Sequence, residues 1–211
     1  APAVVLLHRY GGDRSWLFNL GVKINETTHF TILWPDLRGH GEQPLINWTS
    51  LGARDGDDLV AALNYLRGLK SENQKQLVAE SFGVYGVELG AYSALKATRA
   101  EPQIKVRVLD SVSRSPDELL SSAVSSCVGL DNGIVQSFSR LAVKLYMLGG
   151  YDNTNACDFA RGIRDQRVLL LSGAEAGQLR QSTASLQSCF PNPGNVETRT
   201  DLPLSGFSLP S

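Results

Sequence analysis

The chain has 211 residues, of which 42% are hydrophobic and 19% are charged, as is ordinary for one globular α/β domain with a sizeable core. The formal net charge is −1, which gives no basis for a nucleic-acid partner or for attraction to an anionic membrane. Apolar runs such as AVVLL and VLLLS are too short to cross a bilayer. We therefore expect a soluble protein without a membrane span, and the sequence leaves a cytoplasmic or an extracytoplasmic location open.

The cysteines give no sign of a metal or redox site. Cys127, Cys157 and Cys189 are widely spaced and form no C-x-x-C pair, which argues against zinc binding and thioredoxin-type chemistry. We favour buried thiols over a single disulfide, and the sequence does not say which two cysteines would pair. No metal and no cofactor is expected.

Short runs of β-forming residues alternate with helical patterns along most of the chain, which predicts a parallel sheet with helices on both faces. The predicted strands are 4–7, 30–33, 82–85, 105–109, 167–171 and 196–199. The predicted helices between them are 13–26, 58–69 and 90–100. Asp13 is a plausible N-cap of the first helix. Each crossover is long enough for a right-handed βαβ unit.

The stretch 116–163 interrupts this alternation. It contains three helical segments with no strand between them. We therefore predict one domain over 1–211 with a helical insertion at about 116–163. Such an insertion either covers the carboxyl edge of the sheet as a lid or packs against its side, and the sequence leaves both open.

Three local patterns follow one another in the chain. The first predicted strand ends in His8 and is followed by a glycine pair, in VVLLHRYGG. The second strand leads into PDLRGHG, a D-x-R-G-x-G turn that starts at Asp36. The third strand leads into YGVELG, in which Gly86 and Gly90 flank Glu88.

Together these patterns resemble the α/β-hydrolase superfamily, which includes esterases and lipases. The resemblance covers 4–199 and begins at what would be the third strand of that family. It implies a mostly parallel sheet without the first antiparallel strands. It also implies an oxyanion hole formed by backbone N–H groups, which here would belong to Arg9 and Leu89.

Glu88 stands where this family has its nucleophile, in a G-x-S-x-G turn. Such a turn needs small residues two positions before and after its central residue, and Gly86 and Gly90 are at those positions. A rival A-x-S-x-G pattern is centred on Ser81. We favour Glu88, because the Ser81 alternative would put Gly83, Gly86 and Gly90 into a helix, where each costs about 1 kcal/mol relative to alanine.

The remaining members of the family's catalytic triad would be an acid and then a histidine. Glu175, which follows the predicted strand 167–171, is nearest to the acid position. No histidine lies in the last loop, because His8, His29 and His40 all precede Glu88. His8 could act as a substitute base for Glu88, although we favour a structural role in which it bonds a loop carbonyl.

The functional prediction depends on the absence of a histidine after Glu88 in the sequence. A serine nucleophile needs a base to remove its proton, and a carboxylate nucleophile needs one to activate the water that cleaves the ester intermediate. We predict a non-catalytic protein of this fold that binds a small-molecule ligand or a protein partner, or has a structural role. The alternative is a carboxylic-ester hydrolase with a rebuilt site that uses Glu88 with His8, or Ser81.

Overall fold

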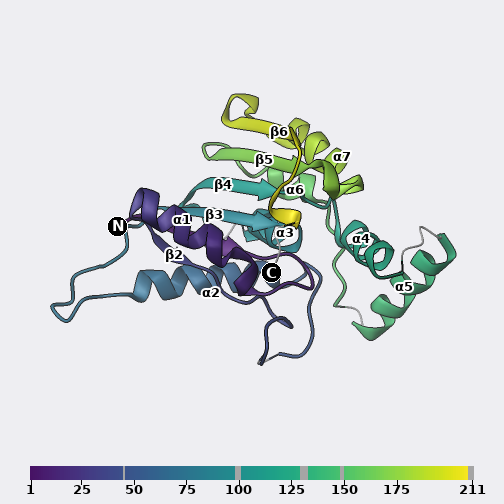
Figure 1. Ribbon diagram of the computed structural model, residues 1–211, viewed down its shortest axis with the longest axis horizontal. Helices are drawn as coiled ribbons and strands as arrows, with labels where there is room; N and C mark the ends of the chain where they lie inside the picture. The colour runs from purple at the N-terminus through teal and green to yellow at the C-terminus, as the bar shows by residue number, and fades with distance from the viewer. Residues whose placement is uncertain (45, 98–100, 129–132, 148–149, 209–211) are drawn as a thin grey trace.

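A computed structural model describes residues 1–211 except 45, 98–100, 129–132, 148–149 and 209–211. Its centre is one six-stranded sheet with the order β2-β1-β3-β4-β5-β6, in which every neighbouring pair is parallel (Figure 1). The strands are β1 (Ala3–Leu7), β2 (Thr31–Leu33), β3 (Phe82–Val87), β4 (Ile104–Asp110), β5 (Arg167–Gly173) and β6 (Val196–Leu202). The predicted α/β fold with a parallel sheet is confirmed.

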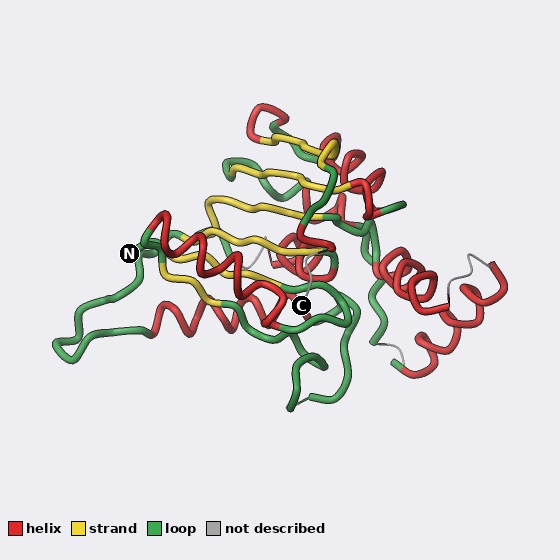
Figure 2. Tube along the Cα trace, viewed as in Figure 1, coloured by secondary structure: helices red, strands yellow, loops and turns green. Residues whose placement is uncertain are grey.

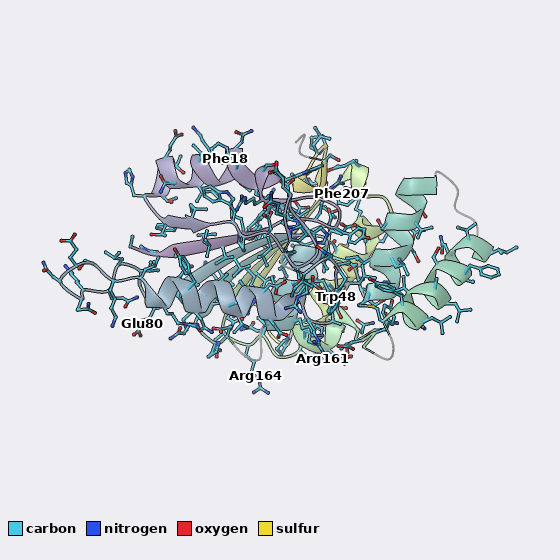
Figure 3. All side chains as sticks on the ribbon, turned by 90° about the horizontal axis from the view of Figure 1, so that it is seen from below. Phe18, Trp48, Glu80, Arg161, Arg164 and Phe207 are labelled. Carbon is cyan, nitrogen blue, oxygen red and sulfur yellow. A yellow bond between two sulfur atoms is a disulfide. The ribbon has the colours of Figure 1, made fainter. Side chains whose placement is uncertain are left out.

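Helices cover both faces of this sheet. One face carries the 3-10 helix η1 (Arg14–Leu17) and α1 (Phe18–Thr28), and Figure 3 shows α1 and α2 on opposite sides of the strands. The opposite face carries α2 (Asp55–Gly68), α3 (Leu89–Lys96), α6 (Ala156–Ala160) and α7 (Gln178–Leu186). Asp13 caps η1, since its side chain accepts a hydrogen bond from the Ser15 N–H.

Each face has its own hydrophobic core because side chains of a strand alternate between the two faces. The larger core lies under α2, whose Leu59, Ala62, Leu63 and Leu66 are buried at helical spacing. The smaller core includes Leu6 and Tyr85 of the sheet and packs against η1 and α1.

The stretch after β4 is helical, with α4 (Pro116–Val128), α5 (Gly133–Tyr146) and then α6. In Figure 1, α4 and α5 extend beyond the carboxyl ends of the strands, away from the two covered faces. None of the helices that the structure describes is long and apolar enough to cross a membrane.

Helix α7 was not predicted from the sequence, and the disulfide was the less favoured of two alternatives. Two of the four buried residues of α7, Ser182 and Thr183, are polar, so its apolar stripe is too thin to be read as an amphipathic helix. Cys157 and Cys189 form a disulfide with a Cα–Cα distance of 5.2 Å. Our preference for buried thiols was therefore wrong for this pair. Cys127 lies on α4, and its side chain is outside the part that the structure describes.

Candidate functional site

The carboxyl ends of parallel strands meet at one edge of the sheet, and the loops that follow them lie together there (Figure 2). In α/β sheets, ligands bind at this edge. The polar residues that the strands and their loops bring to it include His8, Glu88, Asp110, Glu175 and Ser205.

Glu88 occupies a sharp turn between β3 and α3. Its φ of +50° and ψ of −102° are strained for a residue with a side chain, and such strain costs on the order of 1–3 kcal/mol. A Cβ on Gly86 would lie 2.5 Å from the Gly90 carbonyl carbon, and a Cβ on Gly90 would overlap the last carbonyl of β1. Both glycines are therefore required by the close approach of β3, α3 and β1.

The Glu88 side chain is turned inward and is 4% exposed. Its Oε2 accepts a hydrogen bond from the Tyr10 N–H at 3.1 Å. Burial raises the pKa of Glu88 to about 7, and this rise is opposed by the bond from Tyr10 and by the charge of Arg9. Near neutral pH the carboxyl group is therefore balanced between its neutral and ionised forms.

The N–H that reaches Glu88 belongs to Tyr10. Arg9, which the resemblance implies as an oxyanion-hole donor, directly precedes it in the loop after β1. The Arg9 side chain instead donates from Nη1 to the Phe207 carbonyl oxygen at 3.1 Å, and its guanidinium stacks 4.2 Å from the Trp16 ring centroid. Figure 3 shows Phe207 on the same side of the sheet as Phe18 of α1. Leu89, the other expected donor, is the first residue of α3.

His8 has both ring nitrogens bound to the backbone. Its Nδ1 lies 2.8 Å from the Arg9 carbonyl oxygen, and its Nε2 accepts from the Leu37 N–H at 3.0 Å. A ring nitrogen that accepts an N–H is unprotonated, and burial lowers the pKa of His8 further. The proposed pairing of His8 with Glu88 is therefore not what the structure contains. His40 similarly accepts from the Gly11 N–H at 3.2 Å.

Glu175 contacts the last loop of the chain, where the sequence lacks a histidine. Its Oε1 accepts from the Ser205 N–H at 2.6 Å and lies 3.0 Å from Ser205 Oγ. On the next residue, the Gly206 N–H donates to Asp110 at 2.7 Å. Two carboxyl groups therefore fix this loop, and its serine hydroxyl hydrogen-bonds to one of them, Glu175.

Asp110 is a buried residue that the sequence reasoning missed. It also accepts from the Tyr85 hydroxyl at 2.9 Å and from the Ser111 hydroxyl at 2.8 Å. Burial raises the pKa of Asp110. The available signal was an acid directly after a predicted strand, at the edge where ligands bind.

Ser81 lies at the opposite edge. It directly precedes Phe82, the first residue of β3, so it is at the amino end of the sheet and not at a strand-to-helix turn. The A-x-S-x-G alternative is therefore wrong.

Two neighbouring cavities lie near α4, with volumes of about 300 Å³ and about 450 Å³, and Glu175 lines the smaller one. Both are lined by Glu118, Ser121 and Gln178. Residues that line only one of them include Glu175, Phe207, Arg114 and Arg140. Among the described residues there is no group of three or more His, Cys, Asp or Glu that could hold a metal ion.

The fold is similar to that of several solved structures. An esterase from Pyrococcus furiosus matches with a TM-score of 0.68 and 20% identity over 98% of this chain and 75% of the esterase. The enol-lactonase from Burkholderia xenovorans matches with a TM-score of 0.65 and 19% identity over 99% of this chain and 85% of the lactonase. Est1E from Butyrivibrio proteoclasticus, solved with ferulic acid, matches with a TM-score of 0.64 and 14% identity over 96% of this chain and 81% of Est1E.

These likenesses establish the fold: the chain has an α/β-hydrolase fold of the esterase-like kind. No protein-family model matches the sequence, and no curated protein matches it either.

Proposed function

We propose that this protein is a non-catalytic member of the α/β-hydrolase fold that binds a small polar ligand at the carboxyl edge of its sheet. One observation carries the proposal: the Glu88 carboxyl group accepts the Tyr10 N–H. In an esterase of this fold, a loop N–H of this kind stabilises the oxyanion of the transition state. Here the protein's own side chain uses that donor.

The lack of a base supports the same conclusion. If the Glu88 carboxylate attacked an ester, the resulting anhydride would need water activated by a neighbouring base. His8 and His40 each accept a backbone N–H, and Ser205 contacts Glu175 where the family has its histidine. A serine hydroxyl with a pKa far above neutrality does not replace an imidazole.

A carboxylic-ester hydrolase is the second candidate, because the solved structures of similar fold include two esterases and a lactonase. It would require Glu88 to leave the Tyr10 N–H and to find a base that the described geometry does not provide. We therefore rank it below a binding role.

The cavity of about 450 Å³, which is lined by Arg114 and Arg140, favours a ligand rich in hydrogen-bond acceptors. Its two lining carboxylates are already engaged: Glu118 accepts from the Ser182 hydroxyl at 2.5 Å, and Asp117 accepts from the Tyr151 hydroxyl at 2.5 Å. Arg140 has a buried Nε with no partner among the described atoms. The other cavity has an unpartnered acceptor instead, Glu175 Oε2, so the arginine-lined cavity is the one that suits a carboxylate or phosphate group.

Hydrolysis is the direct test. Wild-type protein incubated with p-nitrophenyl acetate and p-nitrophenyl butyrate should release no nitrophenol above buffer, and its intact mass should show no acyl adduct. The variants are Glu88→Ala and, as a matched control, Glu197→Ala, whose side chain is 64% exposed. Turnover that Glu88→Ala abolishes and Glu197→Ala keeps would overturn the non-catalytic proposal.

Ligand binding is tested separately with succinate as the probe in isothermal titration calorimetry. Binding should weaken at least tenfold in Arg140→Gln and stay unchanged in Arg161→Gln, an arginine whose side chain is 66% exposed and pairs with Asp158. Equal binding by both variants would remove the cavities as the ligand site.

A further inference from the structure

The two cavities near α4 differ in the charges that line them. They lie where α4 meets the carboxyl ends of the strands (Figure 1). Arg114 and Arg140 line the larger cavity, together with the engaged carboxyl groups of Asp117 and Glu118. Glu118 and Glu175 line the smaller cavity, and none of its described lining residues is a Lys, Arg or His. The larger cavity therefore suits an anionic group, and the smaller one suits a cationic group.

Each cavity also has a buried polar atom with no hydrogen-bond partner among the described atoms. In the larger cavity this atom is Nε of Arg140, which is a donor. In the smaller cavity it is Oε2 of Glu175, which is an acceptor. Buried polar atoms in proteins are almost always paired. A donor at one end and an acceptor at the other match the carboxylate and the ammonium group of a zwitterion.

The two cavities share a wall, because Glu118, Ser121 and Gln178 line both of them. The Glu118 carboxyl group is already engaged: it accepts from the Arg114 N–H and from the Ser182 hydroxyl, each at 2.5 Å. Glu175 takes part in none of the salt bridges between described residues. A cationic group that enters the smaller cavity therefore finds its partner in Glu175.

Helix α4 sets the distance between the two ends of such a ligand. Arg140 donates to the Ser121 hydroxyl at 2.9 Å, so an anion bound to Arg140 lies at the level of Ser121. Ser125 lines the smaller cavity and is four residues further along α4. Because four residues of an α-helix rise about 6 Å, the two charged groups of a ligand that fills both cavities are about 6 Å apart.

The rest of the smaller cavity fits a short chain between the two charged groups. Ala176, Leu179 and Phe207 line it with apolar surface, against which methylene groups can pack. Ser122 and Ser125 line it as well, and a serine hydroxyl can accept an N–H. An α-amino acid is too short to reach both ends, because its two charged groups are attached to one carbon.

We propose that the two cavities together bind a short zwitterion, with its carboxylate at Arg140 and its ammonium group at Glu175. A short ω-amino acid and a dipeptide share this chemistry. The ligand class rests on the proposed binding role of the cavities and narrows it. The charge difference between the cavities and the unpartnered atom in each of them carry the proposal.

Isothermal titration calorimetry on the wild-type full chain near neutral pH tests the ligand class. The probe is 5-aminopentanoate, and its controls are pentanoate, which lacks the ammonium group, and glutarate, which has a second carboxylate in its place. The probe should bind at least about tenfold more tightly than either control, because a hydrogen bond to a charged group contributes that much. Glycylglycine separates the two sources: tighter binding than 5-aminopentanoate assigns the site to a dipeptide, and weaker binding assigns it to an ω-amino acid.

Substitutions test which residue holds which end. Glu175→Gln should weaken the binding of 5-aminopentanoate at least about tenfold and leave the binding of pentanoate unchanged. Arg140→Gln should weaken the binding of both. Glu197→Gln makes the same chemical change at a side chain that is 64% exposed and should bind like the wild type. The far-UV circular dichroism of each variant should match that of the wild type.

Two results would overturn the zwitterion, and they differ in what they say about the proposed function. If wild-type protein binds neither 5-aminopentanoate nor glycylglycine more tightly than pentanoate and glutarate, while Arg140→Gln weakens the binding of succinate, the binding role remains and only the ligand class is wrong. If neither succinate nor any of these four compounds binds, the cavities are not a ligand site and both proposals fail.

Discussion

Replacing Glu88 by glutamine separates the charge of this residue from its shape. Glutamine keeps an oxygen that can accept the Tyr10 N–H and cannot ionise. In the wild type, burial raises the pKa of Glu88 from 4.5 to about 7. This rise corresponds to about 3 kcal/mol, because one pKa unit equals about 1.4 kcal/mol.

Proton linkage gives the direction in which Glu88 changes the stability of the protein with pH. Below pH 4.5, Glu88 is protonated in the folded and the unfolded chain, so no penalty applies. Between pH 4.5 and about 7 the unfolded chain loses this proton while the folded protein keeps it, so the contribution of Glu88 to stability is lost as pH rises. The Glu88→Gln variant lacks this loss and should gain about 3 kcal/mol relative to the wild type between pH 4.5 and 8.

Urea unfolding followed by circular dichroism at pH 4.5, 6, 7 and 8 measures the difference in unfolding free energy. Other ionisable groups cancel because both proteins contain them. Glu197→Gln, which removes a carboxylate that is 64% exposed, should show almost no change of this difference with pH. If the difference in unfolding free energy between Glu88→Gln and the wild type stays constant with pH, the reasoning is wrong. The hydrogen bond from Tyr10 and the charge of Arg9 would then offset the cost of burying the ionised carboxyl group.

Three further changes test the fold around the site. Replacing Cys157 by serine removes its disulfide with Cys189, which joins residues 32 apart in the sequence. This change should lower the unfolding free energy by about 3–4 kcal/mol. Equal stability of the wild type with and without dithiothreitol would contradict this prediction. Gly90→Ala should lose at least about 2 kcal/mol because its Cβ meets the main chain of β1, while Gly68→Ala, which has open space around it, should be neutral or stabilising in the same thermal unfolding assay. Thr183→Val should lose about 1–3 kcal/mol in urea unfolding, because a buried N–H after β4 loses its acceptor, and an unchanged midpoint would argue against that bond.

A fold similar to that of solved esterases is compatible with the proposed binding role, because proteins that share a fold can differ in their chemistry. The backbone requirements of the turn at Glu88 come from the contact of β3, α3 and β1, and Gly86 and Gly90 satisfy them whatever side chain the turn carries. Retention of these glycines therefore supports the fold and carries no information about hydrolysis.

The sequence by itself determined the elements whose signals are local. All six strands were predicted at their observed positions within a few residues, because short β-forming runs bounded by turns identify buried strands. The face of α2 followed from the spacing of Leu59, Ala62, Leu63 and Leu66. The position of Glu88 between β3 and α3 followed from two glycines at fixed distances.

Only the tertiary structure decided what depends on distant segments. The partner of Cys157 is 32 residues away, and spacing alone does not select a disulfide pair. Helix α7 buries Thr183 because a backbone N–H after β4 lies against it. The direction of the Glu88 carboxyl, toward Tyr10 and away from His8, is set by contacts across 78 residues, because the turn fixes a backbone and the surrounding loops fix the side chain.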